Sequence, residues 1–144
     1  MHGKNTEEWD TSCLRIDHLE GYIELRFSNS SKQAIDEIIC HLQDIAQQSR
    51  TQPDTLPTPI RIFANSTDLR ENVSTQYLLN RIFRHYNDII MGKPTRLAAL
   101  FHNTLLMHVA NRLVKLPDTN IIAFRGFSKG QVEEAVQWLL CDEP

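Results

Sequence analysis

The side chains best placed for chemistry are a serine and a threonine at the expected start of a helix. Ser74 and Thr75 open an apolar pattern that predicts a helix to about Ile90. A phosphate on either hydroxyl would meet free backbone N–H groups and the positive end of the helix dipole, and Arg70 could pair with it. They are therefore candidate phosphoacceptors or helix caps, and we favour the plain cap.

Histidine and cysteine side chains raise the question of a metal site or a nucleophile, but their spacing matches neither. His102 and His108 are six residues apart, which separates them on a helix. Cys40 and His41 are adjacent, so a helix would point them in different directions, and we expect Cys40 to be a small packing residue. The five glycines are isolated, so no phosphate-binding loop is predicted. We expect no catalytic residue, no metal, no cofactor and no enzyme.

A second group of polar residues is expected to form an interaction or ligand surface. Its first members lie in a predicted polar loop, residues 65–68, that follows a strand over residues 60–64. Trp138 lies off the apolar stripe of the last helix; packing explains it, and an exposed indole would suit a partner or ligand. The candidate surface consists of Asn65, Ser66, Asp68, Arg70, Arg96 and Trp138.

The elements that must position these residues begin with a β-hairpin. Residues 14–18 and 22–27 alternate apolar and polar side chains, and Gly21 lies in the turn between them. Two almost wholly apolar runs, residues 97–101 and 121–124, are predicted to be strands buried on both faces of a parallel sheet.

Helical periodicity separates the later strands. Apolar stripes predict helices over residues 35–46, 74–90, 104–114 and 132–140, and a proline-containing loop spans residues 49–59. Gly92 and Pro94 mark the end of the second helix, and Ser128 with Gln131 has the spacing of a capping box for the last. Right-handed crossovers then give an α/β domain: a mixed, mostly parallel sheet of about five strands with about four helices.

Composition is that of an ordinary cytoplasmic domain. The 144 residues suit one domain, so we expect residues 13–144 to fold as a unit after a flexible acidic N-terminus of residues 1–12. No apolar run could span a membrane, the start lacks a secretion pattern, and an odd number of cysteines, three, indicates reduced thiols. The nine bases and four acids of residues 61–125 are too dispersed for a nucleic-acid partner. The oligomeric state is left open.

The order of predicted elements resembles the STAS fold of bacterial anti-sigma-factor antagonists. It resembles more closely the SpoIIAA-like family, also called STAS/SEC14-like domains, over about residues 13–140. Three stretches carry the resemblance: residues 93–100, with a basic residue leading into a buried strand; Leu116-Pro117 before the last strand; and residues 127–139, which end in an Ala-x-x-Trp-Leu pattern.

The resemblance implies a non-enzymatic regulatory or interaction module that binds a protein partner. Its SEC14-like side implies the alternative, a binder of a small apolar or lipid-like ligand, and an unrecognised enzyme is a third interpretation. A closed apolar pocket would favour the ligand, and an exposed apolar patch the protein partner. Ser74 matches the family's phosphoacceptor, but the flanking Asp and Gly of the family motif are replaced by Asn72 and Thr75. We therefore expect that phosphate at Ser74 does not control binding.

Overall fold

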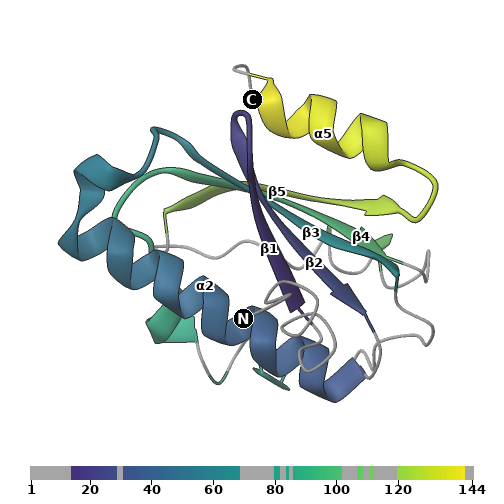
Figure 1. The fold of residues 1–144 in the computed structure, drawn as a ribbon, viewed down its shortest axis with the longest axis horizontal. Coiled ribbons are helices and arrows are strands. Elements are labelled where there is room, and N and C mark those ends of the chain that lie inside the picture. The colour runs from purple at the N-terminus through teal and green to yellow at the C-terminus, as the bar shows by residue number, and fades with distance from the viewer. Residues whose placement is uncertain are drawn as a thin grey trace, which may run out of the picture.

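The sheet lies between helices on its two faces (Figure 1). The computed structural model describes residues 14–28, 31–68, 80–81, 84, 86–101, 107–108, 111 and 120–141. In chain order the elements are β1 (Leu14–Leu19), β2 (Tyr22–Ser28), α2 (Ser31–Thr51), a 3-10 helix (Pro53–Thr55), β3 (Ile60–Asp68), a second 3-10 helix (Tyr86–Ile89), β4 (Thr95–Phe101), β5 (Ile121–Ser128) and α5 (Val132–Leu140).

The five strands follow one another across the sheet in chain order. β1 is antiparallel to β2, and the pairs β2–β3, β3–β4 and β4–β5 are parallel. This confirms the α/β class and the mixed, mostly parallel sheet of five strands. The prediction of about four helices is not borne out: two α-helices, α2 and α5, are found in the part of the chain that the structure describes. Residues 80–81, 84, 107–108 and 111 are also helical, but the extent of those stretches lies outside the described residues.

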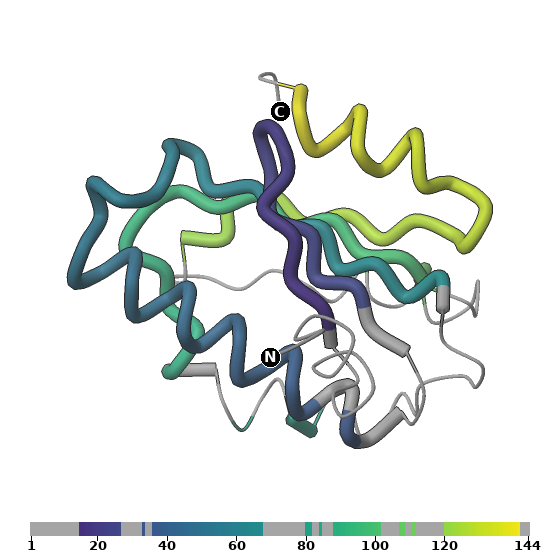
Figure 2. The backbone as a smooth tube through the Cα atoms, in the orientation of Figure 1, coloured from purple at the N-terminus to yellow at the C-terminus, as the bar shows by residue number. Residues whose placement is uncertain are grey.

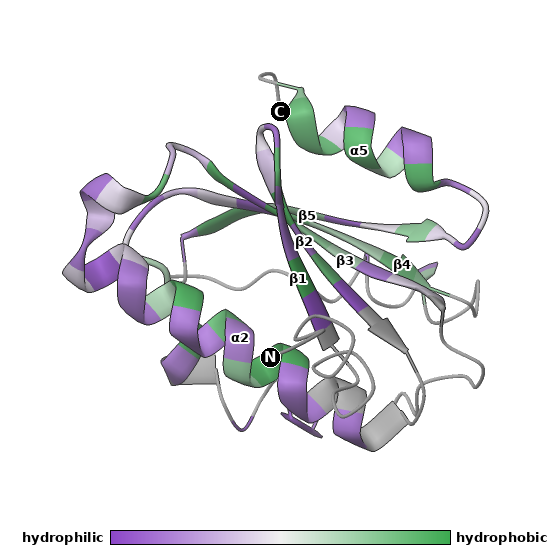
Figure 3. Ribbon diagram, in the orientation of Figure 1, coloured by the Kyte–Doolittle hydropathy of each residue, from purple (hydrophilic) through white to green (hydrophobic). Residues whose placement is uncertain are grey.

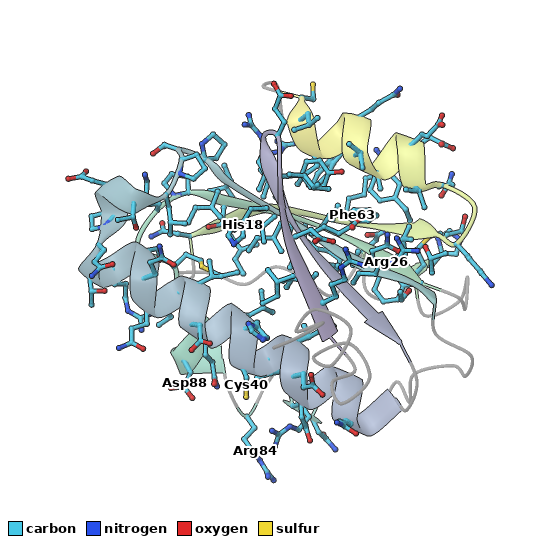
Figure 4. All side chains as sticks on the ribbon, in the orientation of Figure 1. His18, Arg26, Cys40, Phe63, Arg84 and Asp88 are labelled. Atoms are coloured by element: carbon cyan, nitrogen blue, oxygen red, sulfur yellow. The ribbon has the colours of Figure 1, made fainter. Side chains whose placement is uncertain are left out.

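Alternate side chains of the strands build two separate cores, one on each face of the sheet. On one face Leu25 and Ile62, both fully buried, pack with the fully buried Ala46 of α2. On the other face Phe63 and Ala98 pack against Leu139 of α5, and Phe63 points toward α5 (Figure 4). Since neighbouring residues of a strand face opposite sides, Ile62 and Phe63 alone place α2 and α5 on opposite faces.

The third strand is longer than its apolar run. β3 continues through residues 65–68, which the sequence predicts to be a polar loop, so that prediction is wrong. The polar side chains stay in the strand because they find partners inside the protein. Ser66, for example, is buried and its Oγ donates to the carbonyl oxygen of Leu100 at 2.9 Å. A buried hydroxyl with such a partner avoids the cost of desolvation.

The fifth strand lies at an edge of the sheet. Its apolar start predicts a strand that is buried on both faces, and that prediction is wrong. β5 pairs with β4, and two of its residues, Ile121 and Ala123, oppose the consecutive residues Thr95 and Arg96. The residue between them, Ile122, forms a bulge and is 61 % exposed. Bulges of this kind are common at sheet edges, where they disturb the ladder of unpaired backbone groups.

The segment that enters β4 is fixed to the end of α2. α2 runs to Thr51, into the stretch predicted to be a loop, and the backbone N–H of Gly92 donates to Ser49 Oγ at 2.8 Å. A Cβ atom on Gly92 would lie 2.5 Å from the carbonyl oxygen of Ser49. Glycine is therefore needed at position 92 because the two backbones approach closely. The sequence instead predicts that Gly92 caps the end of an α-helix. The segment before Gly92, Tyr86–Ile89, is a 3-10 helix.

Candidate functional site

A buried polar cluster joins the middle of β2 to the carboxyl-terminal half of β3. Asn65 is 3 % exposed, and its Nδ2 donates to Glu24 Oε2 at 3.1 Å. Its Oδ1 accepts the backbone N–H of Thr67 at 3.0 Å and the Thr67 hydroxyl at 2.5 Å. Glu24, Asn65 and Thr67 form what we call the Asn65 cluster. Ligands of open α/β sheets often bind at the carboxyl ends of strands, but these side chains already engage one another.

The cluster acts electrostatically on a neighbouring tyrosine. Tyr22 lies two residues before Glu24 on the same strand, so both side chains are on the α5 face. Burial raises the pKa of Tyr22 above its ordinary value of 10.0, and the negative charge of Glu24 raises it further. The phenol also packs against Phe63, with ring centroids 6.5 Å apart. Tyr22 therefore favours its neutral form, which suits a packing role.

The remaining predicted residues of this end of the sheet are only partly described. Ser66 is held by the Leu100 carbonyl, and Asp68 is the last residue of β3, opposite Ser28 in the register. Arg70, Ser74 and Thr75 lie outside the described residues, so the choice between a helix cap and a phosphoacceptor at Ser74 stays a prediction.

Arg96 and Trp138 are brought together, and they join α5 to the sheet. The guanidinium carbon of Arg96 lies 4.3 Å from the centroid of the Trp138 ring. Nη2 of Arg96 donates to the Trp138 backbone carbonyl at 2.8 Å, and the arginine is 4 % exposed. The indole in turn meets the Phe127 ring edge-on, with centroids 6.0 Å apart. Trp138 is half-buried, so packing accounts for it, as the sequence analysis favours.

The structure does not unite these two groups into one site. In the β3–β4 register Arg96 lies opposite Arg61, four residues before Asn65 along β3. At about 3.3 Å per residue, that separation is about 13 Å along the strand. The predicted surface therefore divides into the Asn65 cluster, in the carboxyl-terminal half of β3, and the Arg96–Trp138 pair near the amino end of β4.

Other residues whose side chains could take part in chemistry have structural roles or lie away from these two groups. Lys93, the basic residue of the family resemblance, donates from Nζ to the carbonyl oxygens of Pro53 at 3.0 Å and Leu56 at 2.6 Å. Cys40 is exposed, on the side of α2 away from the sheet (Figure 4), so the expected packing role is wrong. Within the described residues no three His, Cys, Asp or Glu side chains could hold a metal ion together.

An exposed apolar patch at the hairpin turn was not anticipated from the sequence. The turn lies beside the end of α5 (Figure 2), and a Cβ atom on Gly21 would lie 3.0 Å from Leu140 Cδ2. Leu19 is 44 % exposed and Leu140 is 39 % exposed, and the end of α5 is hydrophobic in Figure 3. We call Leu19, Gly21 and Leu140 the tip patch. Only the tertiary contact between Gly21 and Leu140 brings the turn and the helix end together, so no local signal could reveal the patch.

Comparisons with protein-family models, curated proteins and solved structures find no match to this chain. None of the helices in the described part of the chain is long and apolar enough to cross a membrane. The resemblance to the SpoIIAA-like family accordingly stays a hypothesis that rests on the sequence pattern.

Proposed function

We propose that this chain is a non-enzymatic interaction module that binds a protein partner in the cytoplasm. The observation that carries the proposal is the tip patch: Leu19 and Leu140 are both exposed, and Leu140 lies against Gly21, two residues after Leu19 in the hairpin turn. Exposed apolar side chains that gather from separate elements are typical of surfaces that bind other proteins. The family resemblance supports the same function by analogy alone.

The polar residues that a catalytic site would need are engaged within the fold. Asn65 binds Glu24 and Thr67, Ser66 binds a backbone carbonyl, and Arg96 binds the carbonyl of Trp138. Each hydrogen bond joins two different elements or stabilises a strand end. Their burial is therefore explained by the stability of the domain, and we assign binding to the exposed tip patch.

The charges around the tip patch indicate the chemistry of the partner. Glu20 follows Leu19 in the turn and is exposed. An apolar patch beside an acidic side chain favours a partner that offers apolar side chains flanked by lysine or arginine. The partner that we propose is thus a protein with a basic-rimmed apolar surface.

Site-specific photo-crosslinking tests the proposal. A photoreactive phenylalanine analogue is placed at position 140 of the full chain, in cells that express it naturally, and at position 133 on the same helix as the matched control. We expect one polypeptide to be captured from position 140 and not from 133. After purification this polypeptide should bind wild type and Leu140→Met alike and bind Leu140→Lys at least tenfold more weakly.

Two results would contradict the proposal. One is equal capture from both positions. The other is unchanged affinity of the captured protein for Leu140→Lys. Saturable binding of a fluorescent fatty acid, with no protein captured at position 140, would favour the lipid-ligand alternative instead.

A further inference from the structure

The two edges of the sheet are treated differently by the chain. At the β5 edge Asn111 clamps one residue of the strand: its Oδ1 accepts the N–H of Gly126 at 2.6 Å and its Nδ2 donates to the Gly126 carbonyl at 3.2 Å. With the bulge at Ile122, this blocks addition of another strand. β1 lies at the opposite edge, and within the described residues β2 is its sole strand neighbour. Arg15, Ile16, His18 and Leu19 are exposed.

The outer side of β1 presents a regular set of backbone groups. Leu19 and Tyr22 are opposite each other across a two-residue turn, and a hydrogen bond between first and last residues closes such a turn. Since antiparallel ladders alternate, Arg15, Asp17 and Leu19 direct their backbone groups toward β2. Leu14, Ile16 and His18 direct theirs outward, where another strand could pair with them.

Two charged residues of β1 lie opposite residues of like charge on β2. The register places Arg15 opposite Arg26 and Asp17 opposite Glu24, and like charges directly opposite each other are unfavourable. Arg15 Nε lies 3.5 Å from Asp17 Oδ2 along the same strand, with the arginine side chain 59 % exposed. An exposed ion pair of this kind contributes little to stability.

We propose that β1 is a homodimer interface, in which two copies of β1 pair antiparallel about a two-fold axis at Ile16. This register pairs the outward-directed residues: Ile16 with the second copy's Ile16, and Leu14 with the second copy's His18, giving about six backbone hydrogen bonds. It also places Arg15 opposite the second copy's Asp17, twice by symmetry. Each row of side chains across the joined sheets then contains Arg26 and Arg15 of one copy, followed by Asp17 and Glu24 of the second copy.

Charge selects this axis among those that the backbone permits. An axis at Asp17 would oppose two aspartates, and an axis at Arg15 would oppose two arginines. The exposed Ile16 side chains, each 37 % exposed, would meet across the axis and become buried. The argument does not depend on the function proposed for the tip patch, which lies at the hairpin turn, away from the axis.

Sedimentation velocity of the full chain over a wide concentration range, with charge variants of β1, tests the inference. Wild type should show a reversible monomer–dimer equilibrium. Arg15→Asp places two aspartates opposite each other at both contacts, and Asp17→Arg places two arginines there, so each variant should dimerise about tenfold more weakly or worse. Mixed together, the two variants have only opposite charges across the axis and should form a heterodimer.

Both variants should retain the fold, because each places a charge opposite an unlike charge on β2. Within the chain Arg15→Asp places a carboxylate opposite Arg26, and Asp17→Arg places a guanidinium opposite Glu24, which improves the β1–β2 pairing. The double variant with both changes should dimerise as wild type does. A wild type that stays monomeric at the highest concentration, or a mixture that forms no heterodimer, would overturn the proposal.

A disulfide trap tests the axis itself. In a background whose three native cysteines are changed to serine, Ile16→Cys should give a crosslinked dimer on mild oxidation, because directly paired residues have the Cα separation that a disulfide needs. His18→Cys faces Leu14 of the second copy and should not crosslink. Equal crosslinking at both positions would contradict the register. Leu140→Lys is expected to leave the dimer intact, so loss of partner binding and loss of dimerisation are distinguishable.

Discussion

Arg96 Nη2 donates to the backbone carbonyl of Trp138 at 2.8 Å while the guanidinium lies over the indole ring. The arginine thus holds the last turn of α5 by its backbone and its side chain together. Its Nε is buried, with no acceptor in reach among the described residues. An arginine that is almost completely buried must recover its desolvation cost through such contacts.

Arg96→Met should lower the free energy of unfolding by about 2 kcal/mol, because it removes a charge-assisted hydrogen bond and a desolvated cation–π contact. Arg125→Met is the matched control. Arg125 is exposed and lies 5.0 Å from the centroid of Phe127, so its replacement should cost less than about 1 kcal/mol. Urea unfolding of both variants measures the difference. Equal losses would show that Arg96 does not hold α5 to the sheet.

Gly92→Ala should be strongly destabilising, since its Cβ would lie 2.5 Å from the Ser49 carbonyl oxygen and 2.8 Å from Arg50 Cα. Both obstacles are backbone atoms, so the contact between α2 and the loop must open, at about 2 kcal/mol or more. Gly130→Ala is the control, because a Cβ there meets nothing within 4 Å. Its melting temperature should stay close to that of wild type; a similar loss in both variants would contradict the close-approach account.

Asn65→Asp should give a destabilisation that depends on pH. The new carboxylate would face Glu24 where Nδ2 now donates, at a cost of about 3 kcal/mol at pH 7. Like charges raise the carboxyl pKa values of the folded state above those of the unfolded state, so the loss should shrink as the pH falls and a proton binds. Asn65→Ala adds no charge, so the stability that it loses relative to wild type should not shrink as the pH falls. Parallel pH profiles for the two variants would exclude direct contact with Glu24.

Tyr22 should make the protein lose stability at alkaline pH. Burial and the charge of Glu24 raise its folded-state pKa above 10.0, so the folded state retains the proton longer than the unfolded state does. The stability is fully present below the unfolded pKa and is lost as the pH rises through the folded one. Tyr22→Phe should flatten the profile above pH 10, measured by urea unfolding. An unchanged slope in Tyr22→Phe would assign the loss to other groups.

Four elements could be predicted because the pattern of apolar residues within each is clear without knowledge of its neighbours. They are the hairpin, α2, the buried strand β4 and α5. The limits of β3 could not, since Asn65 and Ser66 look like loop residues until their partners, Glu24 and Leu100, are known to lie beside them. The predicted capping box of α5 is only half formed. Gln131 Oε1 accepts the Ser128 N–H at 2.9 Å, but the Gln131 N–H donates to the Ser128 carbonyl instead of its hydroxyl. The pair closes the preceding turn, and the helix begins at Val132.

The geometry of the polar groups cannot be read from the sequence. Residue type and spacing give no sign that Arg96 and Trp138 touch across 42 positions. The sequence does not identify Glu24 as a site residue, because the polar residues of an alternating strand are expected to face water. In the structure Glu24 is buried and accepts a hydrogen bond from Asn65. Asn65 with Thr67 two residues on has the spacing of an Asx-type contact, the one local signal for the cluster.

The most direct test of the account measures partner affinity and stability together for two variants. The partner is the protein captured from position 140, titrated calorimetrically into folded Asn65→Ala and Leu140→Lys. The account predicts that Asn65→Ala loses about 2 kcal/mol of unfolding free energy and keeps wild-type affinity. Leu140→Lys should keep its stability within about 1 kcal/mol and lose at least tenfold in affinity. Loss of affinity in Asn65→Ala with Leu140→Lys unaffected would place the binding site at the Asn65 cluster and contradict the account.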